Sequence, residues 1–178
     1  MIEIASYSPL WAREFESEAT ALRKALAEFA LRVEHVGSTA VPGLAAKPVI
    51  DIQVSVKSLT PLEAFEEALT PLGYRFVSLG EFDRVYPWFA KPGGWPSTHH
   101  VHLCVAGEEQ EAKHLAFRNY LRSNPDQALR YEALKRKLAT EHQGKSLASV
   151  ESYSLAKTEF IESALASAGL ARRGRSEA

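Results

Sequence analysis

The chain has 178 residues, of which 46% are apolar and 24% are charged, and its formal net charge is −1. This composition predicts a sizeable core, and the charge balance argues against nucleic acid as a partner because no overall basic field attracts phosphate backbones. One cysteine excludes an internal disulfide, and no apolar run is long enough to span a bilayer. We therefore expect a cytoplasmic protein without a membrane segment, with one domain over residues 1–170 and a frayed tail over residues 171–178.

The first predicted element is an amphipathic helix over residues 10–30, which starts after Ser8-Pro9. Its apolar residues recur at helical spacing, so one face of the helix should pack on a sheet. The residues predicted for this face are Leu10, Phe15, Leu22, Leu26 and Phe29, with Trp11 also in the core.

A short strand is predicted from Val33 to Val36, and it stops at Gly37. Ser38 and Thr39 are good helix N-caps, so the chain is expected to turn there into a short helix. A strand, a small-residue turn and a helix start together expose backbone N–H groups that suit a phosphate. The alternative is an ordinary tight turn with a cap.

The run PVIDIQVSV over residues 48–56 predicts a buried strand that is rich in β-branched residues. Asp51 is the anomaly in this run, because an ionised carboxylate there is costly unless a metal, a cation or a cleft receives it. The alternative is a carboxylate at a strand end that pairs with Arg or Lys. Lys47 precedes Pro48 in a loop and is either a solvated lysine or a phosphate contact.

The middle of the chain predicts a helix and two strands. Thr60 to Glu63 form a capping-box pattern with proline at the first helical position, and the helix closes at Gly73. Strands are predicted over residues 74–79 and 84–90, joined by a turn at Gly80. Pro87 favours an edge position or a bulge for the second of these strands.

The run HHVHLCV over residues 99–105 alternates as a strand does, which places His100, His102 and Cys104 on one face. The other face is mostly apolar and should meet the core, so the face with the two histidines should look into a cleft or solvent. These histidines are either surface residues or metal ligands. Together with Asp51 they could form a mononuclear site, and neutral imidazole suits zinc or other transition ions better than magnesium.

Beyond Gly107 the chain is predicted to be helical. Helices are expected over residues 107–122, from Asn124 through Leu138, and from Ser149 to a stop at Gly169. Arg118 is either a candidate phosphate cation or part of a solvated helix face with Arg122. Tyr153 and Lys157 lie one turn apart on the last helix, so both could reach one cleft.

The segment EHVGSTAVPGLAAKPVIDI resembles the signature of the GrpB (UPF0157) family, and the match continues through THHVHLCV to YSLAKTEFI near the end of the chain. That family is grouped by remote similarity with the nucleotidyltransferase fold. The resemblance implies an α/β (α+β) protein with a nucleotidyltransferase-like mixed β-sheet flanked by helices and with a helical C-terminal part.

In that wider fold a Gly-Ser pair holds the triphosphate, and Asp-x-Asp with a third carboxylate binds divalent metal. Carried over, the resemblance implies Gly37 and Ser38 for the phosphate and Asp51 as the first metal ligand. The position of the second carboxylate holds Gln53, which departs from the pattern. The remaining candidates are His100 and His102 as further ligands or a general base, and Thr39, Lys47, Arg118, Tyr153 and Lys157 around the phosphates.

The function expected from this resemblance is metal-dependent nucleotidyl transfer or nucleotide binding, with Mg²⁺ or Mn²⁺ as the cofactor and Zn²⁺ as an alternative. The partner would be a nucleotide or another phosphorylated small molecule. One rival is a non-catalytic ligand-binding or adaptor domain that retained the fold, which Gln53 favours because an amide cannot share charge on a second metal. The other rival is a transition-metal hydrolase that uses Asp51, His100 and His102.

Overall fold

The protein was analysed as a computed structural model, which describes residues 3–93, 96–141 and 155–170. Helices and strands are interspersed up to residue 105, and the described elements after that residue are helices. The helices are α1 (Leu10–Leu26), α2 (Leu62–Leu69), α3 (Glu109–Ser123), α4 (Pro125–Glu141) and α6 (Thr158–Ser167). The strands are β1 (Arg32–Val36), β2 (Ile50–Val56), β3 (Arg75–Val77), β4 (Trp88–Lys91) and β5 (His99–Val105).

The five strands form one mixed sheet in the order β1-β2-β5-β4-β3. Only the central pair, β2 and β5, runs parallel, and the other three pairs are antiparallel. The register of the central pair places Asp51 opposite His100 and Gln53 opposite His102. A mixed sheet flanked by helices confirms the predicted α/β fold class.

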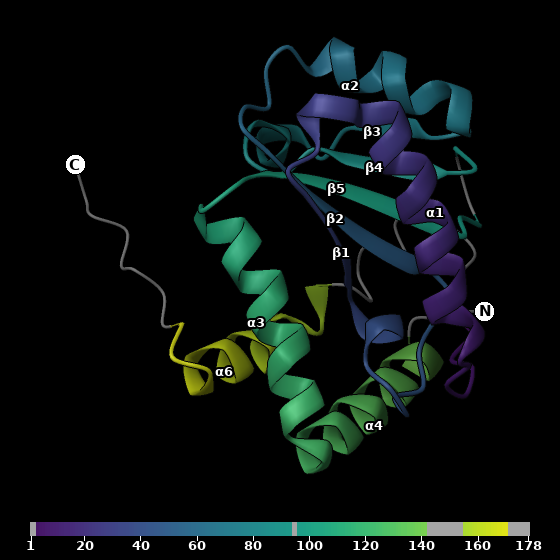
Figure 1. Ribbon diagram of the computed structural model, residues 1–178. Coiled ribbons are helices and arrows are strands. Elements are labelled where there is room, and N and C mark those ends of the chain that lie inside the picture. The colour runs from purple at the N-terminus through teal and green to yellow at the C-terminus, as the bar shows by residue number, and fades with distance from the viewer. Residues whose placement is uncertain (1–2, 94–95, 142–154, 171–178) are drawn as a thin grey trace.

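One face of the sheet is apolar and carries the core. Side chains alternate along β2 and β5, so Ile52, Val54, Val101 and Leu103 all point to this face and are fully buried. Helices α1 and α2 cover it, and Figure 1 shows both on one side of the sheet with α3 on the other. Burial of each large apolar side chain stabilises the fold by roughly 1.5 to 3 kcal/mol, so this layer fixes the sheet on which the site is built.

Helix α1 is shorter than predicted, and its buried face is shifted. It ends at Leu26, because Ala27 has a positive φ of 43° that breaks the helix. Its buried residues are Trp11, Phe15, Ala19, Leu22 and Leu26. Leu10 and Phe29 are exposed, so the prediction that both belong to the packed face was wrong.

The opposite face of the sheet is polar, and α3 docks on it through ion pairs. Glu111 accepts two hydrogen bonds from the Nη2 of Arg32 at 2.6 and 2.8 Å, and one from the hydroxyl of Ser55. About two turns further along α3, Arg118 donates to Glu34 at 2.8 Å and to the carbonyl of His35 at 2.9 Å. The Arg118 side chain is only 11% exposed, so the alternative of a solvated helix face was wrong.

Helix α4 holds the loop between β1 and β2 at residues 41–47. The Ala45 N–H donates to the carboxylate of Glu132 at 3.0 Å, and the Ala45 carbonyl accepts from Lys135. Apolar contacts of Val41 and Leu44 with α3 and α4 support these bonds. Side chains of α4 therefore bond both the N–H and the carbonyl of Ala45, which fixes the loop between β1 and β2.

Residues 60–91 differ from the sequence predictions. The capping box does not form, because Pro61 occupies the N-cap position in an extended conformation and the Thr60 hydroxyl contacts Ser58 instead. Residues 80–84 form a 3₁₀ turn, and the two strands shrink to β3 and β4. Strand β4 lies inside the sheet and begins after Pro87, so the edge position predicted for it was wrong.

The C-terminal predictions are tested only in part. Helix α6 ends near Gly169, which has a positive φ of 83° as predicted for a helix stop. The predicted helix start at Ser149, the residue Tyr153 and the tail over residues 171–178 lie outside the described residues. Among the described helices, none is long and apolar enough to cross a membrane.

His35 gives a test of the packing between α1 and β1. Its ring stacks on Phe15 with centroids 4.7 Å apart, and its Nε2 lies 3.0 Å from the Thr39 hydroxyl. Burial lowers the pKa of His35 to about 4 from 6.5. The unfolded chain therefore binds more protons between these two values, and stability is lost as the pH falls through this window.

We expect the unfolding free energy of the wild type to fall between pH 7 and pH 4 by roughly 3 kcal/mol more than that of a His35→Gln variant, at about 1.4 kcal/mol per pKa unit. Urea denaturation at several pH values measures both profiles. The carboxylates and the other histidines are the same in both proteins, so their contributions to the pH dependence cancel in the comparison. Parallel profiles would contradict the lowered pKa of His35.

Candidate functional site

The site begins at a corner where β1 meets β2. Val36 pairs with Asp51 in the antiparallel register, and the next residue, Gly37, turns the chain with φ 72° and ψ −172°. This conformation is essentially restricted to glycine. A Cβ atom at Gly37 would lie 2.5 Å from the Oδ2 atom of Asp51, so the corner and the carboxylate are in direct contact.

The turn after Gly37 differs in detail from the prediction. Residues Ser38–Ala40 form a 3₁₀ turn whose N-cap position is Gly37, so neither Ser38 nor Thr39 caps it. The Thr39 hydroxyl donates to the Val49 carbonyl at 3.0 Å and accepts from His35. Thr39 is therefore a buried structural residue, whereas Ser38 is half-buried beside the corner.

Asp51 meets two histidines of the neighbouring strand. The Nδ1 of His100 donates to its Oδ1 at 3.0 Å, and the Nε2 of His102 lies 3.6 Å from the same oxygen. The side chains are 30% exposed for Asp51, 13% for His100 and 19% for His102. The two histidines therefore lie on one face of β5, as predicted, and they meet Asp51 there. That face was expected to look into a cleft or solvent, and it is half-buried.

Charge at the site follows from these contacts. Burial by itself raises the pKa of Asp51, but hydrogen bonds from His100 and His102 outweigh it and hold that pKa well below its usual range. Burial lowers the pKa of His100 despite the neighbouring carboxylate. Asp51 is therefore ionised at neutral pH and accepts from a neutral His100.

A stack of rings covers His102. Tyr86 stacks on both His102 and His114, with ring centroids 4.9 and 4.6 Å away and nearly parallel planes, and the two histidine rings are 6.2 Å apart. The Nδ1 of His114 donates to the Gln110 carbonyl, and its Nε2 accepts from the Tyr86 hydroxyl at 3.1 Å. Burial lowers the pKa of His114 to about 4, which keeps it a neutral acceptor. These rings limit access to the site from the side of α3.

The donor set fits one metal ion. Asp51, His100 and His102 each offer one ligand atom, and the three atoms lie within 4.8 Å of one another. One carboxylate oxygen and two imidazole nitrogens suit zinc, manganese or iron better than magnesium. Gln53 is fully buried, and its Nε2 donates to the Glu111 carbonyl at 3.4 Å, so it does not act as a second acidic ligand.

Two lysines predicted as phosphate cations lie near this carboxylate. Burial lowers the pKa of both Lys47 and Lys157 to about 8, and the negative charge of Asp51 acts in the opposite direction on each. Both ammonium groups are therefore within electrostatic range of Asp51. Arg118 is not part of this group, because it is paired with Glu34.

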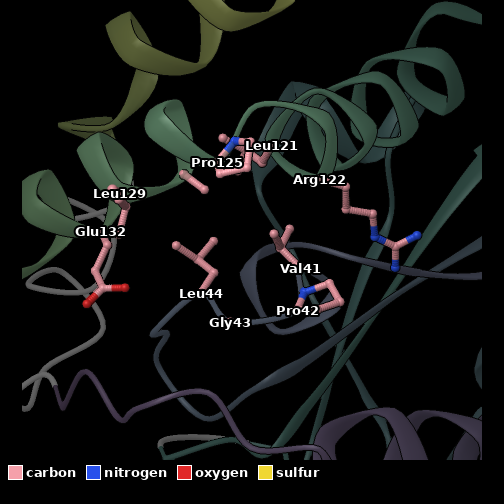
Figure 2. A pocket seen from close by; sticks show the side chains of 10 residues that line it. Val41, Pro42, Gly43, Leu44, Leu121, Arg122, Pro125, Leu129 and Glu132 are labelled. Carbon is pink, nitrogen blue, oxygen red and sulfur yellow. The ribbon is translucent and has the colours of Figure 1, made fainter.

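Two surface hollows lie elsewhere. One of about 520 Å³ is formed by residues 41–44 together with α3 and α4, and Figure 2 shows Val41 and Leu44 facing Leu121 and Leu129 across it. The second, of about 400 Å³, is lined by α1, β1 and α3. Neither is lined by Gly37, Ser38 or Asp51, so the contact between the corner and the acid lies at a partly exposed surface outside both hollows.

Sequence reasoning missed Ser97, whose hydroxyl lies 2.6 Å from the Nε2 of His100. Ser97 is in the loop before β5 and is buried. The sequence shows only that Ser97 precedes His100 by three residues, and this spacing alone does not predict a contact.

Comparison with known proteins gives consistent matches. The family model described as GrpB protein matches residues 1–167. The UPF0157 protein YqkA of Bacillus subtilis is 34% identical over 177 residues, which cover 99% of this chain and 50% of YqkA. The chain therefore spans half the length of that relative.

Solved structures agree with the sequence matches. The crystal structure of conserved protein GrpB from Enterococcus faecalis superposes with a TM-score of 0.80 at 40% identity, covering 93% of this chain and 96% of that one. The Cid1 poly(U) polymerase gives a TM-score of 0.52 at 17% identity, covering 79% of this chain and 46% of Cid1. The second likeness establishes a nucleotidyltransferase-like fold.

The contact between Gly37 and Asp51 can be tested with a matched pair of glycines. Gly43 also has a positive φ, of 81°, but a Cβ there meets nothing within 4 Å. Each Gly→Ala change carries a backbone cost of roughly 1 to 3 kcal/mol. Only Gly37→Ala also displaces the Asp51 carboxylate.

We therefore expect Gly37→Ala to lower the unfolding free energy by at least about 1 kcal/mol more than Gly43→Ala, which is the scale of the cost of overpacking. Urea denaturation of both variants and the wild type measures the difference. Equal losses would show that the corner tolerates a side chain and that Asp51 does not depend on it.

Proposed function

Because the chain belongs to the GrpB family, we propose that it binds a nucleoside triphosphate together with one divalent metal ion and transfers the nucleotidyl group to an acceptor hydroxyl. The observation that carries this proposal is the contact of Gly37 with Asp51, which also meets His100 and His102. The Cid1 structure was solved with MgATP bound, and this supports a nucleotide for a chain of similar fold.

In the proposed reaction the acceptor oxygen forms a bond to the α-phosphorus, and the bond from that phosphorus to the β-phosphate oxygen breaks. Pyrophosphate leaves, and the acceptor proton passes to water. The metal ion would offset the negative charge that develops on the phosphate oxygens. Asp51, His100 and His102 would hold the ion, since their donor atoms lie within 4.8 Å of one another.

The residues around the metal ligands would bind and orient the phosphates. Gly37 lets the backbone approach the carboxylate closely, and the half-buried Ser38 next to it can donate a hydrogen bond to a phosphate oxygen. Lys47 and Lys157 supply positive charge within range of Asp51. A triphosphate close to these lysines would favour their charged forms, because opposite charge raises the pKa of an amine.

The ligand set favours one metal rather than two. A second ion needs a second carboxylate, and Gln53 is an amide whose nitrogen is used by the Glu111 carbonyl. The two imidazole ligands favour Mn²⁺ or Zn²⁺ over Mg²⁺ as the single bound ion. The cytoplasm is the compartment that the proposal requires, since nucleoside triphosphates are made and used there.

A second candidate is a transition-metal hydrolase that uses the same three residues. Two His and one carboxylate leave metal positions open for water, and 30% of the Asp51 side chain is exposed. The two functions differ in product, because transfer releases pyrophosphate and attaches a nucleotide to the acceptor. A protein that binds the metal and the nucleotide but turns over neither substrate would instead be the non-catalytic binding domain that Gln53 favours.

We expect wild-type protein to show a higher melting temperature with Mn²⁺ and ATP together than with either alone. A ligand at 100 times its Kd stabilises the folded state by about 2.7 kcal/mol. Asp51→Asn removes the carboxylate charge and should abolish this shift. Asp126→Asn, an exposed carboxylate at the first turn of α4, is the matched control and should keep it.

Scanning calorimetry with the four nucleoside triphosphates and with Mg²⁺, Mn²⁺ and Zn²⁺ measures the shift, and a pyrophosphate assay follows turnover. A wild type that binds none of these combinations would refute the proposal. If the melting temperature of Asp51→Asn still rises with Mn²⁺ and ATP, the binding site does not include Asp51.

A further inference from the structure

Ser97, His100 and Asp51 form a continuous chain of hydrogen bonds. The Ser97 hydroxyl lies 2.6 Å from the Nε2 of His100, and the Nδ1 of His100 lies 3.0 Å from the Oδ1 of Asp51. Ser97 is 6% exposed, so its hydroxyl is shielded from competing water. Both ring nitrogens of His100 thus have protein partners, and the ring has little freedom to rotate.

We propose that Ser97 is a positioning residue that holds the Nδ1 of His100 toward the metal. This inference rests on the proposed function, because it assumes that His100 is a metal ligand. A ligating histidine usually donates its other ring N–H to a neighbouring group, and such partners set the orientation and the basicity of the ligand. Ser97 is the residue placed to accept that N–H.

A hydroxyl suits this role because it both donates and accepts. Without metal, the Asp51 carboxylate requires the proton of His100 on Nδ1, so Nε2 accepts a hydrogen bond from Ser97. When Nδ1 is a metal ligand, the proton belongs on Nε2, which then donates to the same serine oxygen. Rotation of one hydroxyl is enough for the change, and the imidazole ring stays in place.

His102 differs from His100 in this respect. Its Nδ1 is buried and has no hydrogen-bond partner among the described residues. Its ring is instead held by stacking on Tyr86, with centroids 4.9 Å apart. Of these two histidines, His100 is therefore the one whose tautomer is set by a hydrogen bond from outside the ligand set.

The order Ser97-His100-Asp51 also matches a nucleophile, a base and an orienting acid. A serine nucleophile must contact its substrate, however, and Ser97 is buried within the loop before β5. Its position favours support of His100 over direct attack, and covalent labelling distinguishes the two roles.

The test compares three variants by their affinity for Zn²⁺, measured by isothermal titration calorimetry on folded protein. Ser97→Ala should weaken binding about tenfold or more, the scale of loss seen when such a supporting partner is removed. Ser97→Thr keeps a hydroxyl and should recover most of the affinity. Thr98→Ala is the control, because the Thr98 hydroxyl bonds the Lys91 carbonyl and His99 on the other face of β5.

A second measurement reads the tautomer directly. Two-bond ¹H–¹⁵N NMR spectra of the wild type should show the His100 proton on Nδ1 without metal and on Nε2 with Zn²⁺. In Ser97→Ala the metal-free proton should stay on Nδ1, because Asp51 still accepts it, but with Zn²⁺ the ¹⁵N shift of Nε2 should differ from that of the wild type, because the Nε2–H has lost its serine acceptor. A change limited to packing would leave the Nε2 shift of the zinc-bound protein unaltered.

Each outcome decides a separate point. If the wild type binds no Zn²⁺ or Mn²⁺, the proposed function fails and the role of Ser97 fails with it. If the wild type binds metal and Ser97→Ala binds equally well with the same Nε2 shift in the zinc-bound protein, only the role of Ser97 is refuted. Labelling of Ser97 by a fluorophosphonate that disappears in His100→Ala would assign the serine as a nucleophile instead.

Discussion

An ionised carboxylate in the middle of a sheet must be compensated, and this constraint organises the candidate site. Asp51 is on the central strand β2, where the neighbouring residues on the strand are fully buried. Its charge is stabilised by His100 and His102 from the parallel neighbour β5, and its other oxygen lies against Gly37. The parallel pairing of β2 and β5 is therefore the feature on which the site depends, since any other register would separate the acid from the histidines.

The two faces of the sheet use different forces. The apolar face is stabilised by burial of side chains under α1 and α2, and a titratable side chain on this face, His35, stacks on Phe15. The polar face is joined to α3 by the ion pairs Arg32–Glu111 and Arg118–Glu34. Partly buried pairs of this kind contribute geometry as much as stability, because each guanidinium accepts only a narrow range of partner positions.

The sequence predicted the parts of this structure that depend on local pattern. Alternation along residues 48–56 and 99–105 predicted β2 and β5, placed the two histidines on one face, and identified Asp51 as a charge in a buried strand. These inferences needed only neighbours in sequence. Resemblance to a family over most of the chain, rather than periodicity, supplied the mixed-sheet fold and the expected role of Gly37 and Ser38 in phosphate binding.

The features that the sequence analysis missed or predicted wrongly depend on contacts that the local residue pattern does not determine. Arg118 is 84 residues from its partner Glu34, and no local pattern distinguishes such a buried ion pair from a solvated helix face. Ser97 and His100 are close in sequence, but their contact depends on how the loop before β5 folds back. The capping box at Thr60 failed because Pro61 took the N-cap position, so that competing local geometry overrode a motif.

The bonds between α4 and Ala45 have a consequence for the two segments that flank the histidine and carboxylate residues. Glu132 and Lys135 bond the N–H and the carbonyl of Ala45 as an adjacent strand would, which ties the β1–β2 connection to α4. The segment over residues 79–86 is held differently, because Tyr86 stacks on His102 while Leu79 and Val85 are exposed. One flank of the site is thus anchored by charged groups of a helix and the other by contact between rings.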